Sequence, residues 1–199
     1  MDERLVRAET VVFDVGNVLL SFDPDRVLEA LAPQADRPAL REALWGEKRL
    51  WSRLDLGRDS NEAVADCLAA ETGLPRARET LLYIICNFHR VMSPLPLYTL
   101  LPEVRQAGKR MYILSNYPEP SFSLLCAAYP RLTELMDGAV VSSRERIVKP
   151  DPAIFHLLMR RYAVRPENAL FIDDAAANIQ TAAGLGFSAW HYAGNDRIR

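Results

Sequence analysis

The sequence has one dominant order: a short apolar segment, a polar or charged residue directly after it, and then a helical pattern. Apolar segments of this length and composition are typical of parallel strands that are buried on both faces. The predicted strands are 11–13, 111–114, 138–141, 169–172 and 188–192. The predicted helices between them are 96–106, 120–128, 152–162 and 175–183. This alternation predicts an α/β fold, a doubly wound parallel sheet.

Residues 22–91 interrupt the alternation, because they show helical patterns and no strand pattern. About four helices are predicted there, at 25–31, 38–51, 61–72 and 75–88. We therefore expect two parts, an α/β core formed by residues 1–21 and 92–199 and an all-helical insertion formed by residues 22–91.

The overall charge gives no support to nucleic-acid binding. The 199 residues include 24 Lys and Arg against 26 Asp and Glu, a formal net charge of −2, and no basic cluster stands out. No apolar run approaches the roughly 18 residues that cross a bilayer, and the first ten residues lack a signal-peptide pattern. We expect a soluble, cytoplasmic protein without a nucleic-acid or membrane partner, and the sequence leaves the oligomeric state open.

The three cysteines are an odd number without a CxxC spacing, so we expect neither a disulfide framework nor a structural zinc site. Each one has apolar neighbours in the sequence. We therefore expect Cys67, Cys86 and Cys126 to be small buried side chains.

Polar groups follow the predicted strands where the strands end. They are Asp14 after the first strand, Ser115 and Asn116 after the second, Lys149 after the third, and Asp173 and Asp174 after the fourth. In open parallel sheets the active groups gather beyond the carboxyl ends of the strands. The sequence therefore predicts that three carboxylates, a lysine and a hydroxyl converge at one edge of the sheet.

Such a set of charges points to a metal and a phosphate. Two carboxylates about 5 Å apart repel each other by about 3 kcal/mol at an effective dielectric constant of about 20. One lysine does not compensate three of them, and oxygen ligands favour Mg²⁺ over zinc. The metal, Lys149, Ser115 and backbone N–H groups would together hold a phosphate, and one carboxylate remains as a nucleophile.

Each of these elements also has an ordinary explanation when it is taken alone. Asp14 could form a turn, Ser115 and Asn116 could form another, and Lys149 could lie at a solvated helix start. The adjacent acids Asp173 and Asp174 are harder to explain in this way, because they repel each other at a buried strand end. The combination in this order favours the chemical interpretation.

The segments FDVGN, ILSN, VKPDPAIF and FIDDAAAN resemble, in order and spacing, the four motifs of the haloacid dehalogenase superfamily. The resemblance implies a Rossmann-like core and makes residues 22–91 a C1-type helical cap. The DD form of the last motif resembles the subgroup with the phosphatase domain of soluble epoxide hydrolases and bacterial α-D-glucose-1-phosphate phosphatases. The implied activity is a Mg²⁺-dependent phosphatase of small phosphate esters, with sugar phosphates favoured.

The resemblance also implies roles for the residues at the motif positions. Asp14 would be the nucleophile that forms an aspartyl-phosphate, and Lys149 would neutralise it and the transferred group. Ser115 and Lys149 would act in catalysis, and Asn17, Ser115, Asn116 and Lys149 would bind the phosphate.

The implied metal ligands are Asp14, Asp174 and the backbone carbonyl of Gly16. Asp173 would assist directly or through a neighbour, and Asn178 would orient a metal-bound water.

Gly16 is the departure from the family pattern that matters for the reaction, because the family usually has a second aspartate at this position as general acid and base. General acid–base catalysis typically contributes about 10²–10⁴-fold. Sugar 1-phosphates and acyl phosphates have better leaving groups, so Gly16 favours such substrates. The competing hypothesis is a proton delivered from the cap, with Asp23, Glu47 or His89 as the donor.

The resemblance implies that the cap closes on the site, so residues 44–48 and 51–58 are expected to contact the substrate. For Trp45 and Trp51 we expect a place in the core or between the two parts. His191 lies in a predicted strand and is expected to be packed rather than catalytic.

Three other functions compete with the phosphatase. A dehalogenase would use the same Asp14 on carbon without a metal, which leaves Asp173 and Asp174 unexplained. A phosphoacceptor receiver domain has similar groups, but it has the acid pair first along the chain. A catalytically weak binding module would account for Gly16, but Asp14, Lys149 and Asp174 are all present.

Overall fold

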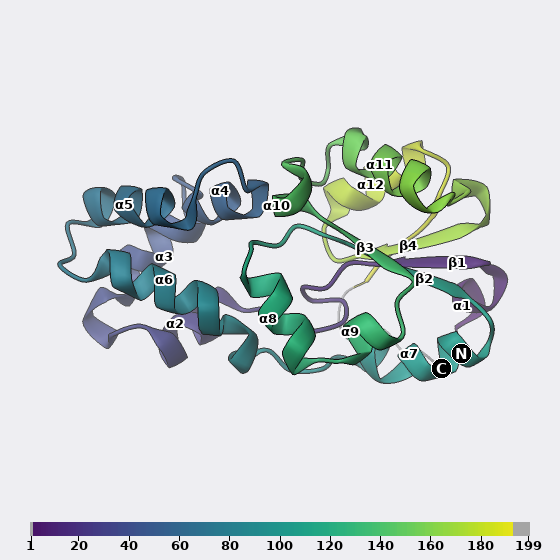
Figure 1. Cartoon of the computed structure of the whole chain (residues 1–199), viewed down its shortest axis with the longest axis horizontal. Coiled ribbons are helices and arrows are strands. Elements are labelled where there is room, and N and C mark those ends of the chain that lie inside the picture. The colour runs from purple at the N-terminus through teal and green to yellow at the C-terminus, as the bar shows by residue number, and fades with distance from the viewer. Residues whose placement is uncertain (1, 193–199) are drawn as a thin grey trace.

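One five-stranded parallel sheet forms the centre of the computed structural model, which describes residues 2–192. The sheet order is β3-β2-β1-β4-β5, so β1 lies in the middle (Figure 1). Its strands are β1 Thr10–Phe13, β2 Arg110–Ser115, β3 Gly138–Val141, β4 Ala169–Asp173 and β5 Ser188–His191. All four pairings are parallel, which confirms the predicted doubly wound α/β fold. The order reverses beside β1, and this is where such sheets leave a crevice at the strands' carboxyl ends.

Helices cover both faces of the sheet (Figure 1). One face carries α7 Pro96–Gln106, α8 Ser121–Ala128 and α9 Arg131–Glu134, and the other carries α11 Pro152–Tyr162 and α12 Ala176–Gly184. The short helices α1 Glu3–Arg7 and α10 Ser142–Glu145 and the 3₁₀ turn η3 Pro166–Asn168 complete the layers. Val11 and Phe13 pack on the first face and Val12 on the second, because successive strand residues point to opposite sides.

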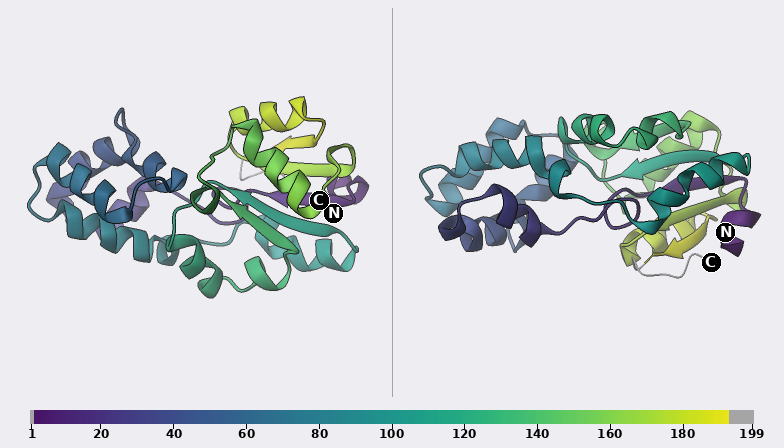
Figure 2. Two further views of the ribbon diagram at one scale, coloured as in Figure 1. Left: turned by 45° about the horizontal axis from the view of Figure 1, so that its top comes forward. Right: turned by 90° about the horizontal axis from the view of Figure 1, so that it is seen from below.

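The insertion forms a helical cluster at the end of the sheet where β1 ends, apart from the strands in every view (Figures 1 and 2). Its helices are α2 Pro24–Leu31, α3 Arg37–Trp45, α4 Leu50–Leu56, α5 Asn61–Thr72 and α6 Ala77–Asn87. The 3₁₀ turn η1 Gln34–Asp36 joins α2 to α3, and a second one, η2 Phe88–Val91, follows α6 at the end of the insertion.

The prediction of a single helix over 38–51 is wrong, because two helices, α3 and α4, occupy this stretch. The Gly46 N–H closes α3 on the carbonyl of Glu42 at 2.8 Å, and a Cβ at Gly46 would lie 2.5 Å from that same oxygen. Arg49 then adopts a left-handed conformation with φ 48°, which sets α4 in a new direction.

The two chain segments that join the insertion to the sheet lie side by side. The Ser21 N–H donates to the Ser93 carbonyl at 2.8 Å, and the Leu95 N–H donates to the Leu19 carbonyl at 2.9 Å. However, one apolar cluster runs without a break from the sheet into the insertion. The division into residues 1–21 and 92–199 against residues 22–91 therefore stays a prediction.

The prediction that the three cysteine side chains are buried is wrong. All three thiols are free, but Cys86 is exposed and Cys67 and Cys126 are only half-buried. The apolar neighbours in the sequence occupy other faces of the same helices, so they do not cover the thiols. Between residues 2 and 192, no helix is both long and apolar enough to cross a membrane.

Candidate active site

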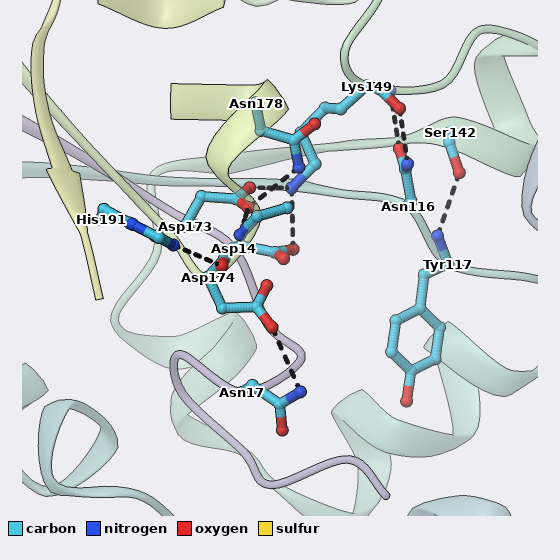
Figure 3. Close-up of polar contacts among 11 residues, drawn as sticks. Asp14, Asn17, Asn116, Tyr117, Ser142, Lys149, Asp173, Asp174, Asn178 and His191 are labelled. Atoms are coloured by element: carbon cyan, nitrogen blue, oxygen red, sulfur yellow. Dashed lines mark hydrogen bonds and ion pairs between the residues drawn. The ribbon is translucent and has the colours of Figure 1, made fainter. Parts of the chain in front are cut away.

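The polar groups that follow the strands come together at the carboxyl end of the sheet (Figure 3). Asp14 follows β1, Ser115 ends β2, Asp173 ends β4 with Asp174 next to it, and Lys149 comes from the loop before α11. Asp14, Ser115, Lys149 and Asp173 are all buried. Four predicted site residues thus form a cluster that water scarcely reaches.

Lys149 lies between two carboxylates. Its Nζ is 2.6 Å from Oδ2 of Asp173 and 3.0 Å from Oδ1 of Asp14. Burial alone would lower the pKa of Lys149, but Asp14 and Asp173 outweigh that effect and raise it. Lys149 therefore stays an ammonium ion, with its charge directed at Asp14.

Burial raises the pKa of Asp14 to about 6, although Lys149 opposes this effect, as does a hydrogen bond with Ser115. The charge of Asp173 adds to the increase. In this site Asp14 is thus a carboxylate whose ionised form depends on the neighbouring positive charge.

Asp173 serves mainly to hold the other groups. Its Oδ1 accepts hydrogen bonds from the Ala175 N–H at 2.8 Å and from Nδ2 of Asn178 at 2.9 Å, and its Oδ2 faces Lys149. Asn178 thus donates its amide to Asp173. Its role towards a metal-bound water stays a prediction.

Asp174 is only partly buried and lies beside Asn17. The Asn17 amide donates to Oδ2 of Asp174 at 3.2 Å, and its own Oδ1 accepts the Phe22 N–H at 2.8 Å. His191 is exposed and its Nε2 lies 2.8 Å from the backbone oxygen of Asp174, so the expectation that it packs in the core is wrong. Since β5 is an edge strand, only part of it is covered.

Asn116 makes a contact that the sequence did not reveal. Its Nδ2 donates to the Lys149 carbonyl at 2.9 Å, and its Oδ1 accepts the Lys149 N–H at 2.8 Å. This reciprocal pair fixes the backbone of Lys149 against the end of β2 (Figure 3). The proposed contact of Asn116 with phosphate stays a prediction.

Three acidic side chains are arranged as metal ligands could be. Asp14, Asp173 and Asp174 each offer a carboxylate oxygen, and these oxygens all lie within 4.8 Å of one another. An all-oxygen set of this kind suits a hard divalent cation such as Mg²⁺. Gly16 lines the adjoining cavity.

A cavity of about 370 Å³ lies between the sheet and the insertion, and Asp14, Ser115 and Asp174 line its polar side. The insertion contributes a largely aromatic wall. Trp45 and Trp51 stack there with ring centroids 4.8 Å apart, and both line the cavity. Parts of the stretches 44–48 and 51–58 therefore border this cavity, and their contact with a substrate stays a prediction.

One acidic residue of this cavity was not singled out from the sequence. Asp55, on the last turn of α4, lines the cavity, and its Oδ1 is buried without a hydrogen-bond partner. Burial raises the pKa of Asp55 to about 7, and the charge of Asp14 adds to the increase. Its signal in the sequence was the spacing of four from Trp51, which puts both on one helix face.

The proton donors suggested from the sequence lie elsewhere. Asp23, Glu47 and His89 are not among the residues that line this cavity. Asp23 instead caps α2 by accepting the Asp25 N–H at 2.9 Å. Burial lowers the pKa of His89.

Comparison with known proteins gives a family match over most of the chain. The model of the haloacid dehalogenase-like hydrolases matches residues 8–186. A D-ribitol-5-phosphate phosphatase of Bacteroides thetaiotaomicron is 24% identical, covering 90% of this chain and 89% of its own. A sesquiterpene phosphatase of Aspergillus oryzae is 22% identical, covering 92% and 89%. The mouse acyl-CoA dehydrogenase family member 10 is 27% identical over 88% of this chain, which spans only 17% of that protein.

Solved structures share the fold. A haloacid dehalogenase family enzyme of Bacteroides thetaiotaomicron, determined as a magnesium complex, superposes with a TM-score of 0.78 at 18% identity, covering 96% of each chain. An L-2-haloacid dehalogenase of Xanthobacter autotrophicus superposes with a TM-score of 0.66 at 22% identity, covering 92% of this chain and 76% of its own.

Proposed function

This chain belongs to the haloacid dehalogenase-like hydrolases, and we propose that it is a Mg²⁺-dependent phosphatase of small phosphorylated metabolites. The observation that carries the proposal is the position of the Lys149 ammonium group, 3.0 Å from Asp14 and 2.6 Å from Asp173, beside a cavity that Asp14 itself lines. This arrangement leaves a nucleophilic carboxylate facing a space in which a phosphate would meet positive charge.

The three carboxylates fit a magnesium ion, since their oxygens lie within 4.8 Å of one another. Asp14, Asp174 and the carbonyl of Gly16 would hold it, with Asp173 assisting. When bound, the ion supplies positive charge that neutralises the phosphate and lowers the repulsion among the acids.

The side chains of the site then have separate tasks in the reaction. A carboxylate oxygen of Asp14 attacks phosphorus, the ester bond breaks, and an aspartyl-phosphate forms on Asp14. Lys149 and Ser115 hold the phosphoryl oxygens, while Asn116 and Asp173 keep Lys149 in place. Water then attacks the phosphorus and restores Asp14.

The substrate's organic part would lie against the insertion. A sugar phosphate remains the favoured class, and the similarity to a ribitol-phosphate phosphatase supports it. The stacked pair Trp45 and Trp51 also suits phosphate esters with an apolar or flat organic group, which makes these the second candidate class. We also propose that residues 22–91 act as a C1-type cap, since Leu44, Trp51 and Asp55 border the cavity.

Hydrolytic dehalogenation is the rival activity, because dehalogenases share this fold. The acidic cluster weighs against it. Asp173 and Asp174 beside Asp14 bring negative charge that displacement of a halide on carbon does not require.

The test is phosphate release from p-nitrophenyl phosphate and from a panel of sugar, acyl, aryl and isoprenoid phosphates. It compares wild type with Asp14→Asn, each with Mg²⁺ and with EDTA. We expect activity that requires both the metal and Asp14, and no halide release from 2-chloropropionate. Silence across the panel from folded protein that still binds Mg²⁺ would instead support a binding module without catalysis.

A further inference from the structure

The family resemblance described above implies a proton donor at position 16, but this chain has Gly16 there, which carries no titratable group. An ester oxygen that departs as an alkoxide is a poor leaving group unless it is protonated as the bond breaks. For substrates with such a leaving group, an acid from another part of the chain would have to lie near Asp14 and face the substrate.

Asp55 is the residue of the insertion that meets these conditions. It lines the same cavity as Asp14, and its Oδ1 is buried with no hydrogen-bond partner. A buried carboxyl oxygen without a partner lowers stability, so this oxygen points to a role other than holding the fold together. Asp14 and Asp55 border this cavity from opposite parts of the chain, Asp14 from the end of β1 and Asp55 from α4.

Several charged or titratable groups act on Asp55 or are affected by it. Burial has the largest effect on its pKa, Asp14 adds to the increase, and Lys149 opposes it. Tyr117 borders the same cavity, and the charge of Asp55 helps to raise the pKa of its phenol. Asp55 thus lies among the groups that border the cavity, where its carboxyl group could face the ester oxygen of a bound substrate.

The backbone of Asp55 is anchored to the sheet. The Ser142 hydroxyl donates to the Asp55 carbonyl at 2.5 Å and accepts the Tyr117 N–H at 3.0 Å. Ser142 begins α10, which contacts α4 (Figure 1), and Figure 3 shows its bond to Tyr117. Tyr117 follows Ser115 by two residues, so the anchor connects Asp55 to the strand end that would hold the phosphate.

Gly57 makes this close approach possible. It ends α4 with φ 63°, and a Cβ there would lie 2.2 Å from the backbone oxygen of Ser143. A larger residue would push α4 away from α10 and would carry Asp55 away from the cavity.

From this geometry we propose that Asp55 is the general acid and base of the reaction. The insertion would thus supply the carboxyl group that position 16 does not, because that position holds a glycine. The proposal rests on the phosphatase activity proposed above. It assigns to α4 a direct chemical role in addition to shaping the cavity.

The proton balance of the reaction is complete with Asp55 alone. As Asp14 attacks phosphorus and the ester P–O bond breaks, the departing oxygen takes the proton of the Asp55 carboxyl group. The resulting Asp55 carboxylate accepts a proton from the water whose oxygen attacks the phosphorus. The bond from phosphorus to Asp14 then breaks, and both side chains return to their starting states.

The test uses two aryl esters of similar shape, phenyl phosphate and p-nitrophenyl phosphate, whose leaving groups differ in basicity. Asp55→Asn keeps the size of the side chain but has no proton to give. We expect kcat/KM for phenyl phosphate to fall about 10²-fold or more. The fall for p-nitrophenyl phosphate should be smaller by a factor of about ten or more. Asp55→Asn should also release a burst of p-nitrophenolate equal to the enzyme concentration, because the phosphoenzyme then lacks its base.

Asp59→Asn is the matched control. Asp59 lies just beyond α4, pairs with Arg53 at 2.8 Å and does not line the cavity, so we expect wild-type kinetics from this variant. Asp55→Ser is a second acid-free variant, in case Asp55→Asn does not fold. An equal loss on both esters, no loss on either, or the same loss in Asp59→Asn would overturn the proposal.

Failure of this inference can be told from failure of the proposed function. If wild type hydrolyses neither these esters nor any member of the panel described above, or does so without Asp14, the phosphatase proposal is wrong. If wild type needs Asp14 and Mg²⁺ but Asp55→Asn shows no dependence on the leaving group, only the role of Asp55 is wrong.

Discussion

The Ser142 hydroxyl donates a hydrogen bond to the backbone carbonyl of Asp55 at 2.5 Å, across the junction between the sheet and the helical insertion. The same hydroxyl accepts the Tyr117 N–H at 3.0 Å. A single fully buried side chain thus links the insertion's acid to the loop after β2. The position of α4 and the geometry of the phosphate end of the cavity are coupled through this side chain.

Ser142→Ala tests this coupling. It leaves the Asp55 carbonyl and the Tyr117 N–H without their shared partner, which costs about 1–3 kcal/mol for buried groups. We expect a lower denaturation midpoint and a larger loss of kcat/KM for phenyl phosphate than for p-nitrophenyl phosphate. Ser143→Ala is the control, because the Ser143 hydroxyl is buried without a partner, and its removal should cost nothing. Equal stability of the two variants would contradict the account.

Gly57→Ala tests the close packing of α4 on α10. Gly57 and Gly73 both end helices in the left-handed conformation, with φ 63° and 64°. A Cβ at Gly57 would meet the Ser143 oxygen at 2.2 Å, while a Cβ at Gly73 meets nothing within 4 Å. Gly73→Ala should therefore cost only the backbone strain, about 1 kcal/mol.

We expect Gly57→Ala to cost clearly more than Gly73→Ala in urea unfolding, and only Gly57→Ala to lower turnover. Similar unfolding free energies for the two variants would show that α4 does not depend on this contact.

The raised pKa of Asp55 has a consequence for stability that does not depend on activity. In the folded protein the group keeps its proton up to a pKa of about 7, against an ordinary value of 3.8. The folded state therefore binds more protons between these values, and the contribution of Asp55 to stability falls as pH rises from about 4 to 7. Asp55→Asn removes this pH-dependent loss of folding stability, because asparagine does not ionise.

We expect the stabilisation by Asp55→Asn, measured in EDTA, to be about 2–3 kcal/mol greater at pH 8 than at pH 5. Asp59→Asn serves as the control, because its hydrogen bond with Arg53 lowers the pKa of Asp59, so its removal gives no such gain with rising pH. A pH-independent difference between Asp55→Asn and wild type would contradict the burial of an ionisable group at this position.

Gly16→Asp asks whether position 16 and Asp55 supply the same proton. The backbone at Gly16 needs no left-handed conformation, and a Cβ there would meet only Phe22 at 3.9 Å, so an aspartate fits. We expect Gly16→Asp to change phenyl phosphate hydrolysis by less than about threefold in wild type and to raise it at least about tenfold in Asp55→Asn. Equal gains in both backgrounds would mean that Asp55 donates no proton.

The sequence was most informative where the fold itself dictates position. Asp14, Ser115 and Asp173 lie at or just after strand ends, and parallel strands bring those ends together whatever the loops do. The hydrogen-bond partners of Lys149 within the cluster were harder to predict from the sequence. The reciprocal bonds with Asn116 depend on how a loop folds back, which no local pattern reports.

The insertion was the hardest part to predict. Helix α3 ends because Gly46 has room only for a hydrogen atom beside Glu42, and the helical pattern of 38–51 does not reveal this. Asp55 looked like one acid among many on a helix surface. It became distinctive only when α4 packed on α10 and carried its carboxyl group over Asp14's cavity, since such proximity is a property of tertiary packing.

The central claim is that Asp14 accepts the phosphoryl group. The most direct measurement is mass spectrometry of protein quenched in acid during turnover of p-nitrophenyl phosphate with Mg²⁺. We predict an added HPO₃ mass on the peptide that contains Asp14, sensitive to hydroxylamine, more abundant in Asp55→Asn and absent from Asp14→Asn. Steady phosphate release by Asp14→Asn at the wild-type rate, with no adduct in either protein, would contradict the account.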